Sequence, residues 1–525
     1  MLKKKISVIL AVLLIFSMIL TACGADEPVV DTGAEDRIAE LEAELEAAEA
    51  ELVTAKDDDG VAESELEALQ AELAAAEAKL EEAQAEEVLS DEIKIIPFIT
   101  QETDAASIAV YQNIIKEYQA ANPGIQIDLV VSSDPDTMGE RMIAAAAVGA
   151  DMGIVSINAA QFQEFYDADL LLPLDRVVDT IGEEKFIPGS LVYADDGSVY
   201  MMGYNGGAYG VLWVNTEMLE AAGLDIPTNY EEVLAAAEAM TIDKDGDGEI
   251  DQFGIALPGS AHAATGYVLT DILYENCAGF YDKQGNVIFD HPNTLTALEH
   301  YAALLEYAPE AASAWAWGDI INAVLAEQAA MGWYYGRLGV NAFNADPEIR
   351  DKLQPIHFFA GENYSSFQGY DYFEVYSGVQ YPEETLDFLE YLMVGQPMVD
   401  FLLTVPGHLA AATYGLEDAI LASENEYVQR YPDDVIFLFG EMGFGASPSV
   451  QMGAMNPDSC DMDFSLNTMP WSSVVFGADN VPGTVIHKIF MDEMTPEEAW
   501  QWGVDELKAI ADEWKADNPD WTPAE

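Results

Sequence analysis

Two apolar patterns alternate along the chain from about residue 89 onward. Short apolar runs predict strands at Ile93–Phe98 and Ile125–Val130. Between them the apolar residues recur at helical spacing, among them Ile108, Ile114 and Tyr118, so a helix is expected there. Strand, helix and strand at this distance predict a parallel α/β sheet with a right-handed crossover.

Several later segments have the pattern of amphipathic helices. They are Tyr230–Met240, Leu295–Tyr307, Pro382–Met393 and Pro496–Trp514. The region from residue 89 to residue 525 is longer than a single hydrophobic core usually serves, so two lobes are expected.

The N-terminus has the pattern of an export signal. Lys3, Lys4 and Lys5 precede the apolar run Ile6–Leu20, which is shorter than the roughly 20 residues of a membrane-spanning helix. The run ends in Leu-Thr-Ala-Cys23, which resembles the lipobox of bacterial lipoproteins. We therefore predict a signal peptide at 1–22, a lipidated Cys23 and a tether at 23–34 that anchors the chain to the membrane. A single membrane-spanning anchor is the alternative.

Residues 35–88 consist mainly of Ala, Glu and Leu. Apolar positions follow a heptad from Ile38 to Leu52 and again from Leu66 to Leu80, with an Asp57–Gly60 break between them. This predicts an N-terminal α-helical, coiled-coil-like spacer. Parallel copies would repel through their many glutamates, so a spacer is favoured over an oligomerising coiled coil.

The net charge of the chain excludes some classes of binding partner. The chain has 20 basic and 95 acidic residues, a formal net charge of −75. Such a surface repels nucleic acid and anionic lipid headgroups, and it disfavours anionic ligands that no local group compensates. Cys277 and Cys460 are the other cysteines, and they form either one disulfide or two buried thiols.

An ordered series of segments resembles one known family. The segments are Tyr118–Ile125, Leu170–Asp175, Asp196–Tyr200, Leu212–Met218, Ala222–Pro227, Pro382–Met393 and Pro496–Trp514. In this order and spacing they are similar to extracellular solute-binding proteins of the sugar type, which serve ABC importers. The resemblance implies a two-lobe periplasmic-binding-protein-like α/β fold with a hinge. It also implies the membrane permease of an ABC importer as a partner.

A sugar site combines flat aromatic faces with a few donors and acceptors, because sugar rings present C–H faces and hydroxyl groups together. Aromatic clusters and polar loop residues after predicted strands meet this requirement, although core packing also explains any single aromatic. The candidates are Thr100, Gln101, Glu102, Asn158, Tyr204, Asn205, Trp317, Trp333, Tyr335, Arg337, Tyr370, Tyr372 and Trp471.

An acidic loop, Asp243–Gly254, has the spacing of a calcium loop. Oxygen ligands are expected from the carboxylates of Asp243, Asp245, Asp247 and Asp251 and from the carbonyl of Glu249. Gly254 stands where an EF-hand has its bidentate glutamate, so another ligand would come from elsewhere. We predict a structural Ca²⁺ site here, and a solvated acidic loop is the alternative.

The common catalytic motifs, including HExxH, Gly-x-Ser-x-Gly, the Walker loop and CxxC, are missing from the sequence. We therefore predict a non-enzymatic, extracytoplasmic, lipid-anchored receptor. It would capture a sugar or oligosaccharide between two lobes and deliver it to the importer. A surface glycan-processing enzyme and an adhesin-like lipoprotein are the alternatives.

Overall fold

The computed structural model describes most of the chain beyond residue 92. The described residues are 73, 93–103, 105–132, 138–157, 162–186, 190–194, 197–208, 210–282, 284–361, 368–404, 410–411, 415–438, 469–472, 474–478, 480–519 and 521–522. The chain divides into two compact units, Met1–Ile93 and Lys94–Glu525. In the first unit only Leu73, which is helical, and Ile93 are described. The predicted signal peptide, lipidated Cys23 and tether, and all of the spacer except Leu73, therefore lie outside the described residues.

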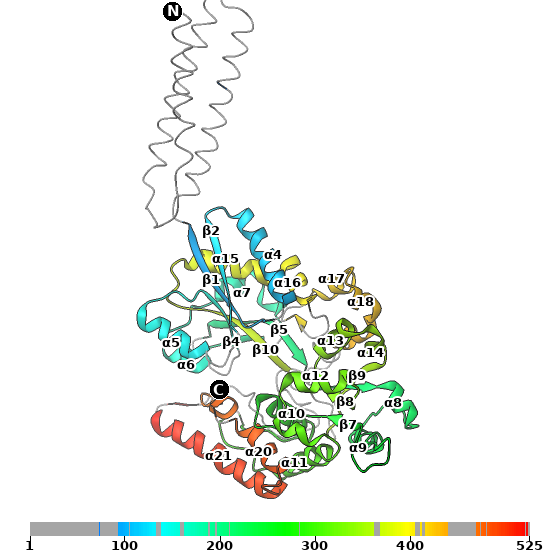
Figure 1. Ribbon diagram of the computed structural model, residues 1–525. Helices are drawn as coiled ribbons and strands as arrows, with labels where there is room; N and C mark the ends of the chain where they lie inside the picture. Colours follow the sequence, from blue (N-terminus) through cyan, green and yellow to red (C-terminus); the bar gives the residue numbers. More distant parts are fainter. Residues whose placement is uncertain are drawn as a thin grey trace, which may run out of the picture. The chain divides into compact units, whose positions relative to one another are not determined.

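The first lobe of the second unit contains a seven-stranded sheet with the strand order β11-β5-β10-β3-β1-β2, in which β4 pairs with β5 (Figure 1). Its strands are β1 (Lys94–Thr100), β2 (Ile125–Val131), β3 (Ile154–Ile157), β4 (Leu191–Tyr193), β5 (Val199–Ala208), β10 (Gln368–Val375) and β11 (Ala410–Ala411). Its helices are α4 (Ala105–Ala121), α5 (Met138–Val148), α6 (Phe162–Asp167), α7 (Asp175–Ile181), α15 (Pro382–Met393), α16 (Gly395–Leu402), α17 (Glu417–Leu421), α18 (Glu426–Arg430) and α19 (Pro432–Ile436).

The predicted strand–helix–strand unit is confirmed. Strand β1 pairs in parallel with both β2 and β3, and α4 connects β1 to β2. The apolar stripe of α4 is buried on the sheet, where Tyr111 meets the edge of Phe98 with ring centroids 5.1 Å apart. Strand β10 comes from much later in the chain and pairs antiparallel with β3 and β5. The first lobe is therefore complete only after the chain has built most of the second.

The second lobe contains a four-stranded sheet with the order β7-β8-β6-β9. Its strands are β6 (Val211–Asn215), β7 (Phe253–Ala256), β8 (Ala329–Trp333) and β9 (Leu353–His357). Its helices are α8 (Thr216–Ala221), α9 (Tyr230–Ala239), α10 (Ala263–Glu275), α11 (Pro292–Leu305), α12 (Trp317–Leu325), α13 (Arg337–Ala345), α14 (Pro347–Asp351), α20 (Val481–Phe490) and α21 (Pro496–Asp517).

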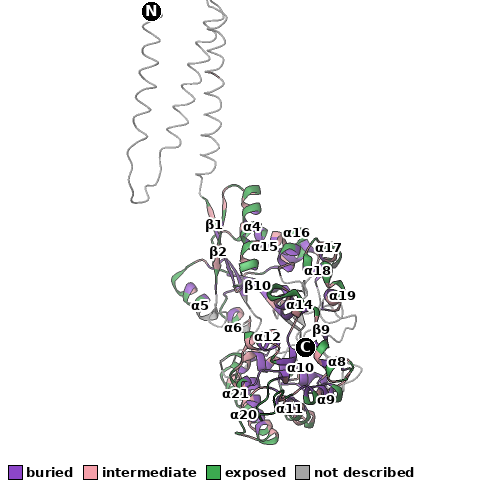
Figure 2. Ribbon diagram, turned by 45° about the vertical axis from the view of Figure 1, so that its right-hand side comes forward, coloured by how far each residue is buried: buried purple, intermediate pink, exposed green. Residues whose placement is uncertain are grey.

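The second lobe has its own hydrophobic core. Every residue of β6 and β8 is buried, as expected of inner strands covered on both faces. Helix α10 is almost entirely buried, and it packs against α11 and α20 (Figure 2). The helices predicted near Tyr230, Leu295, Pro382 and Pro496 are all present, with ends that shift by a few residues.

The chain passes between the lobes three times. Residues 209–210 separate β5 from β6, and residues 358–367 separate β9 from β10. After α19, Leu438 already packs in the core of the second lobe. Separate sheets and cores joined by these passages confirm the predicted two-lobe α/β fold.

Arg350 of α14 joins the two lobes on one side. Its side chain is 1% exposed, and its guanidinium lies 4.9 Å from the ring of Trp213 in β6 of the second lobe. The same guanidinium donates hydrogen bonds to Tyr427 Oη in α18 and pairs with Asp434 in α19. It also lies 4.0 Å from the ring of Tyr431, the residue between these two helices of the first lobe. One buried cation therefore bonds to groups of both lobes.

Cys277 forms a disulfide. This excludes a free thiol at Cys277. Its partner lies outside the described residues, as do both other cysteines of the chain.

Candidate ligand-binding site

The loop after β1 is fixed by Thr100. This side chain is fully buried, and its Oγ1 accepts a hydrogen bond of 3.1 Å from the backbone N–H of Glu102. Its carbonyl accepts another from Ser132 N–H at 2.8 Å. Thr100 therefore positions its neighbours Gln101 and Glu102 and lies beneath them.

An irregularity in β5 brings two consecutive side chains to the same cluster. The register between β10 and β5 shifts after Asp371, so that Asn205 pairs with Asp371, Gly203 pairs with Tyr372, and Tyr204 is the extra residue. Tyr204 Oη lies 2.8 Å from Ser156 Oγ and accepts a hydrogen bond from Gln101 Nε2 at 3.5 Å. Burial raises the pKa of Tyr204 well above its ordinary value, so the hydroxyl stays protonated.

Asp371 is the acidic centre of this cluster. Asn205 Nδ2 donates to Asp371 Oδ2 at 3.2 Å, and Gln101 makes a second side-chain hydrogen bond to the carboxyl. Burial raises the pKa of Asp371, while these two hydrogen bonds and the charge of Arg337 act in the opposite direction. The set that we name the polar floor consists of Gln101, Glu102, Ser156, Asn205, Asp371 and the hydroxyl of Tyr204.

Aromatic side chains of the second lobe form a separate group. Trp317, the first residue of α12, has ring centroids 5.5 Å from Tyr267 and 6.1 Å from Tyr335, and all three side chains are half-buried. Trp333 lies behind Trp317 in a stacked arrangement at 6.1 Å, fully buried, and its indole N–H donates to Asp271 at 3.1 Å. The set that we name the aromatic wall consists of Tyr267, Trp317, Trp333, Tyr334 and Tyr335.

Arg337 connects the two groups. It is the first residue of α13, directly after the aromatic wall, and its Nη2 lies 3.8 Å from Glu102 Oε2 in the polar floor. The two side chains are 22% and 9% exposed, so the ion pair is largely shielded from water. The charge of Arg337 also acts on Asp371 and on Tyr334, which places it within electrostatic reach of both lobes.

The structure therefore brings together Gln101, Glu102, Tyr204, Asn205, Trp317, Tyr335 and Arg337 from the predicted set, with Trp333 behind Trp317 in the hydrophobic core of the second lobe. Asn158 lies outside the described residues. The sequence prediction did not include Ser156 or Tyr267, and it contained Asp371 and Tyr334 only as members of aromatic clusters, without a role of their own. The three consecutive aromatic residues Trp333, Tyr334 and Tyr335 are the sequence feature that indicates Tyr334.

Three predicted aromatics occupy hydrophobic cores instead. Tyr370 and Tyr372 are 6% and 1% exposed and pack with Met142, Phe165 and other apolar residues of the first lobe. Side chains alternate along a strand, so the face of β10 that carries these tyrosines is opposite to the one that carries Asp371.

Trp471 is fully buried in the second lobe, where its ring contacts Tyr281, Trp514 and Trp521 at centroid distances of 5.4–5.6 Å. The prediction that Trp471, Tyr370 and Tyr372 contact the ligand is therefore wrong, because all three side chains are buried in hydrophobic cores.

Glu374 shares the buried face of β10 with these tyrosines. Among the residues that the structure describes, neither of its carboxyl oxygens has a hydrogen-bond partner, and burial raises its pKa to about 8. A carboxyl in this state is neutral at pH 7. It belongs to the lobe core and is separate from the polar floor.

The acidic loop before β7 is folded into a compact turn. The side chain of Asp243 accepts hydrogen bonds from Gly246 N–H at 2.7 Å and from Gly248 N–H at 2.9 Å, and these bonds lower its pKa. Carboxylate oxygens of Asp243, Asp245 and Asp247 lie within 4.8 Å of one another. Asp251 Oδ2 instead accepts from Lys244 N–H at 2.6 Å. Three of the predicted ligands therefore form a group of the type that binds a hard cation.

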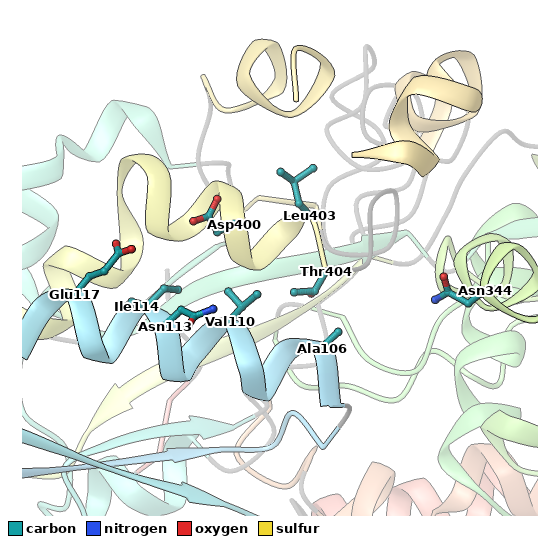
Figure 3. A pocket seen from close by; sticks show the side chains of 9 residues that line it. All are labelled: Ala106, Val110, Asn113, Ile114, Glu117, Asn344, Asp400, Leu403 and Thr404. Atoms are coloured by element: carbon teal, nitrogen blue, oxygen red, sulfur yellow. The ribbon is translucent and has the colours of Figure 1, made fainter. Parts of the chain in front are cut away.

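A pocket of about 470 Å³ is lined mainly by the first lobe, with Asn344 of α13 as a further lining residue (Figure 3). Residues of α4, including Val110, Asn113 and Glu117, line one side, and Asp400 of α16 lies opposite them. None of its lining residues belongs to the polar floor or the aromatic wall.

Comparisons with known proteins agree with this architecture. The chain is similar to a putative ABC transporter periplasmic-binding protein, YcjN, of Escherichia coli K12, with 24% identity over 214 residues. That alignment covers 40% of this chain and about half, 48%, of the relative.

Solved structures match over a longer stretch. Maltose-bound MalE3 of T. maritima covers 79% of this chain and 99% of its own, with a TM-score of 0.63 and 16% identity. A solute-binding protein of an ABC transporter from Thermotoga lettingae, bound to α-D-tagatose, covers 80% and 100%, with a TM-score of 0.64 and 17% identity. These likenesses establish the fold. The family model described as bacterial extracellular solute-binding protein matches residues 104–393, more than half of the chain, which therefore belongs to that family.

Proposed function

We propose that this protein captures a sugar or an oligosaccharide between its two lobes and delivers it to the membrane permease of an ABC importer. The observation that carries the proposal is the junction of the polar floor and the aromatic wall at the Arg337–Glu102 ion pair. Hydroxyl groups pair with the floor, and the C–H faces of sugar rings pack on Trp317 and Tyr335. The sugars bound by the similar structures support this ligand class.

Binding would close the lobes about the three chain passages, as hinge proteins do. Family membership and the hydrogen-bonded floor support binding without chemical change. We therefore expect the bound ligand to be released chemically unchanged.

The test is a thermal-shift screen of the purified chain against monosaccharides, oligosaccharides and polyols, followed by calorimetry and mass analysis of the ligand. A binder gains stability with one carbohydrate class and returns the ligand unchanged. Stabilisation by peptides or polyamines alone would reject the sugar assignment, and release of a shorter product would favour the glycan-processing alternative.

We also propose that Cys23 carries a lipid anchor on the outer face of the cell membrane. The basic, apolar and small-residue order of 3–23 supports this. Cells grown with a labelled fatty acid should label the wild-type chain and not the Cys23→Ser variant, which should be recovered from the medium. A labelled variant would reject Cys23 as the attachment site.

A structural Ca²⁺ at the acidic loop is part of the proposal. Asp243, Asp245 and Asp247 would supply carboxylate oxygens, since their geometry fits a hard cation. The ion would stabilise the turn between α9 and β7 and take no part in ligand chemistry.

A further inference from the structure

The charges of the site point to a further level of specificity, which depends on the proposed function. In the described part of the site, the first lobe contributes two carboxyl groups, Glu102 and Asp371. The second lobe contributes one guanidinium, Arg337. The ion pair between Arg337 and Glu102 joins residues that follow β1 and β8, so it crosses from one lobe to the other.

Arg337 begins α13, a helix that packs into both lobes. The next residue, Leu338, is fully buried in the core of the second lobe, and Val340 is buried in the core of the first. Glu102 is held by the first lobe through the hydrogen bond of its N–H to Thr100. The ion pair between them is largely shielded from water, and an unpaired charge in such a place is costly.

A neutral polyol leaves this balance unchanged, because its hydroxyls donate to the carboxyls and accept from Arg337 and Asn205. A sugar acid adds a carboxylate beside Glu102 and Asp371 and competes with them for the same guanidinium. Like charges brought together in a desolvated site repel strongly. The chain as a whole carries a net charge of −75, so its long-range field adds to the rejection of anions.

We propose that Arg337, paired with Glu102 across the lobes, determines specificity by charge: the site accepts uncharged sugars and polyols and rejects the corresponding sugar acids. Glu102 occupies the position of an internal anion, and Arg337 has no spare charge for a second one. Asp371 prevents the guanidinium from being shared with a ligand carboxylate.

The experiment compares matched pairs that keep the same ring and differ only in an acid group, such as glucose with glucuronate and galactose with galacturonate. Calorimetry of the full exported chain should show binding of at least one neutral member, with its acid partner at least about 100-fold weaker. The variant Glu102→Gln removes the carboxylate that competes with a ligand acid group for Arg337, so it should reduce this ratio to about tenfold or less. Asp371→Asn should reduce the ratio in the same direction and gives a second reading if Glu102→Gln binds poorly.

Glu383→Gln is the matched control. It removes the same charge from an exposed pair with Arg176, away from the site, and should leave the ratio unchanged. Equal binding of both members by the wild type would overturn the inference and leave the proposed function standing. So would an unchanged ratio in both site variants. Absence of binding by every neutral sugar would reject the proposed function itself.

Discussion

The two sides of the site are built from different forces. In the polar floor of the first lobe, each side chain is directed by another: Asn205 and Gln101 bond to Asp371, and Gln101 also reaches Tyr204. In the aromatic wall of the second lobe, ring positions are set by packing, with Trp333 fixed to Asp271 behind Trp317. Directional bonds select among ligands, whereas ring contacts contribute affinity to any ligand with an apolar face. If the site binds a sugar as proposed, we expect the polar floor with Arg337 to discriminate among ligands and the aromatic wall to supply most of the binding energy.

A second contrast lies within β10 itself. Asp371 has hydrogen-bond partners on one face of the sheet, while Glu374, buried on the opposite face, has none within the described part of the chain. The strand therefore contains one carboxyl that serves the site and another that only costs stability when it ionises.

The largest expected effect comes from Glu374. Its pKa is raised from 4.5 to about 8 in the folded chain, so the contribution of the protonated Glu374 to stability is complete below pH 4.5 and is lost as the pH rises through 8. The difference is on the order of 5 kcal/mol. Glu374→Gln should abolish this slope in urea unfolding measured from pH 5 to pH 9. The exposed Glu383→Gln variant should retain it. A Glu374→Gln protein with the wild-type slope would contradict the assignment.

The next effect tests the aromatic wall. Trp317→Ala should weaken sugar binding roughly 30-fold, about 2 kcal/mol, because a half-buried ring that contacts ligand is removed. Trp502→Ala removes another half-buried indole, which lies 5.0 Å from Lys488 outside the site, and should leave affinity unchanged. Calorimetry with the sugar found in the screen measures both. If the two variants bind equally well, the wall does not contribute binding energy.

A smaller effect is expected in the polar floor. Asp371→Asn keeps the shape of the side chain and removes its charge, so affinity should fall about tenfold. The loss should differ between sugars that vary at one hydroxyl, whereas the loss in Trp317→Ala should be similar for all of them. If each variant loses the same binding affinity for all of these sugars, the polar floor does not discriminate among ligands.

The smallest effect concerns the acidic loop of the second lobe. Chelation of calcium should lower the melting temperature by about 2 °C or more, since an ion that binds only the folded state stabilises it. Asp245→Asn should make the protein insensitive to the chelator, while Asp290→Asn, in an exposed pair with Lys508, should not. A melting temperature that ignores both chelator and added calcium would favour the solvated loop.

The sequence predicted the fold better than the site. Periodicity located α4, α9, α11, α15 and α21, because amphipathic patterns are local and directly visible. The floor depended on events that no local pattern shows. Tyr370 and Tyr372 lie on one face of β10 and Asp371 lies on the other. Which of the two faces belongs to the site follows only from the position of β10 between β3 and β5.

Burial was the other information that the sequence lacked. The sequence alone does not distinguish Trp471 from Trp317. In the structure Trp471 is surrounded by Tyr281, Trp514 and Trp521, whereas Trp317 remains half-buried. Contacts with residues distant in the chain decide between these outcomes. The irregularity at Tyr204 is similar, since it depends on pairing with a strand more than a hundred residues away.

The buried Arg350 has a consequence for how an exported protein works in changing surroundings. Burial alone would lower the pKa of this group, but Tyr427 and Asp434 raise it above its ordinary value, so the cation persists at any acidity that a cell meets. Two ring faces that cannot titrate in that range enclose it. A change of environmental pH therefore leaves this contact between the lobes charged, whereas the proposed ligand site contains acidic groups whose protonation does depend on pH.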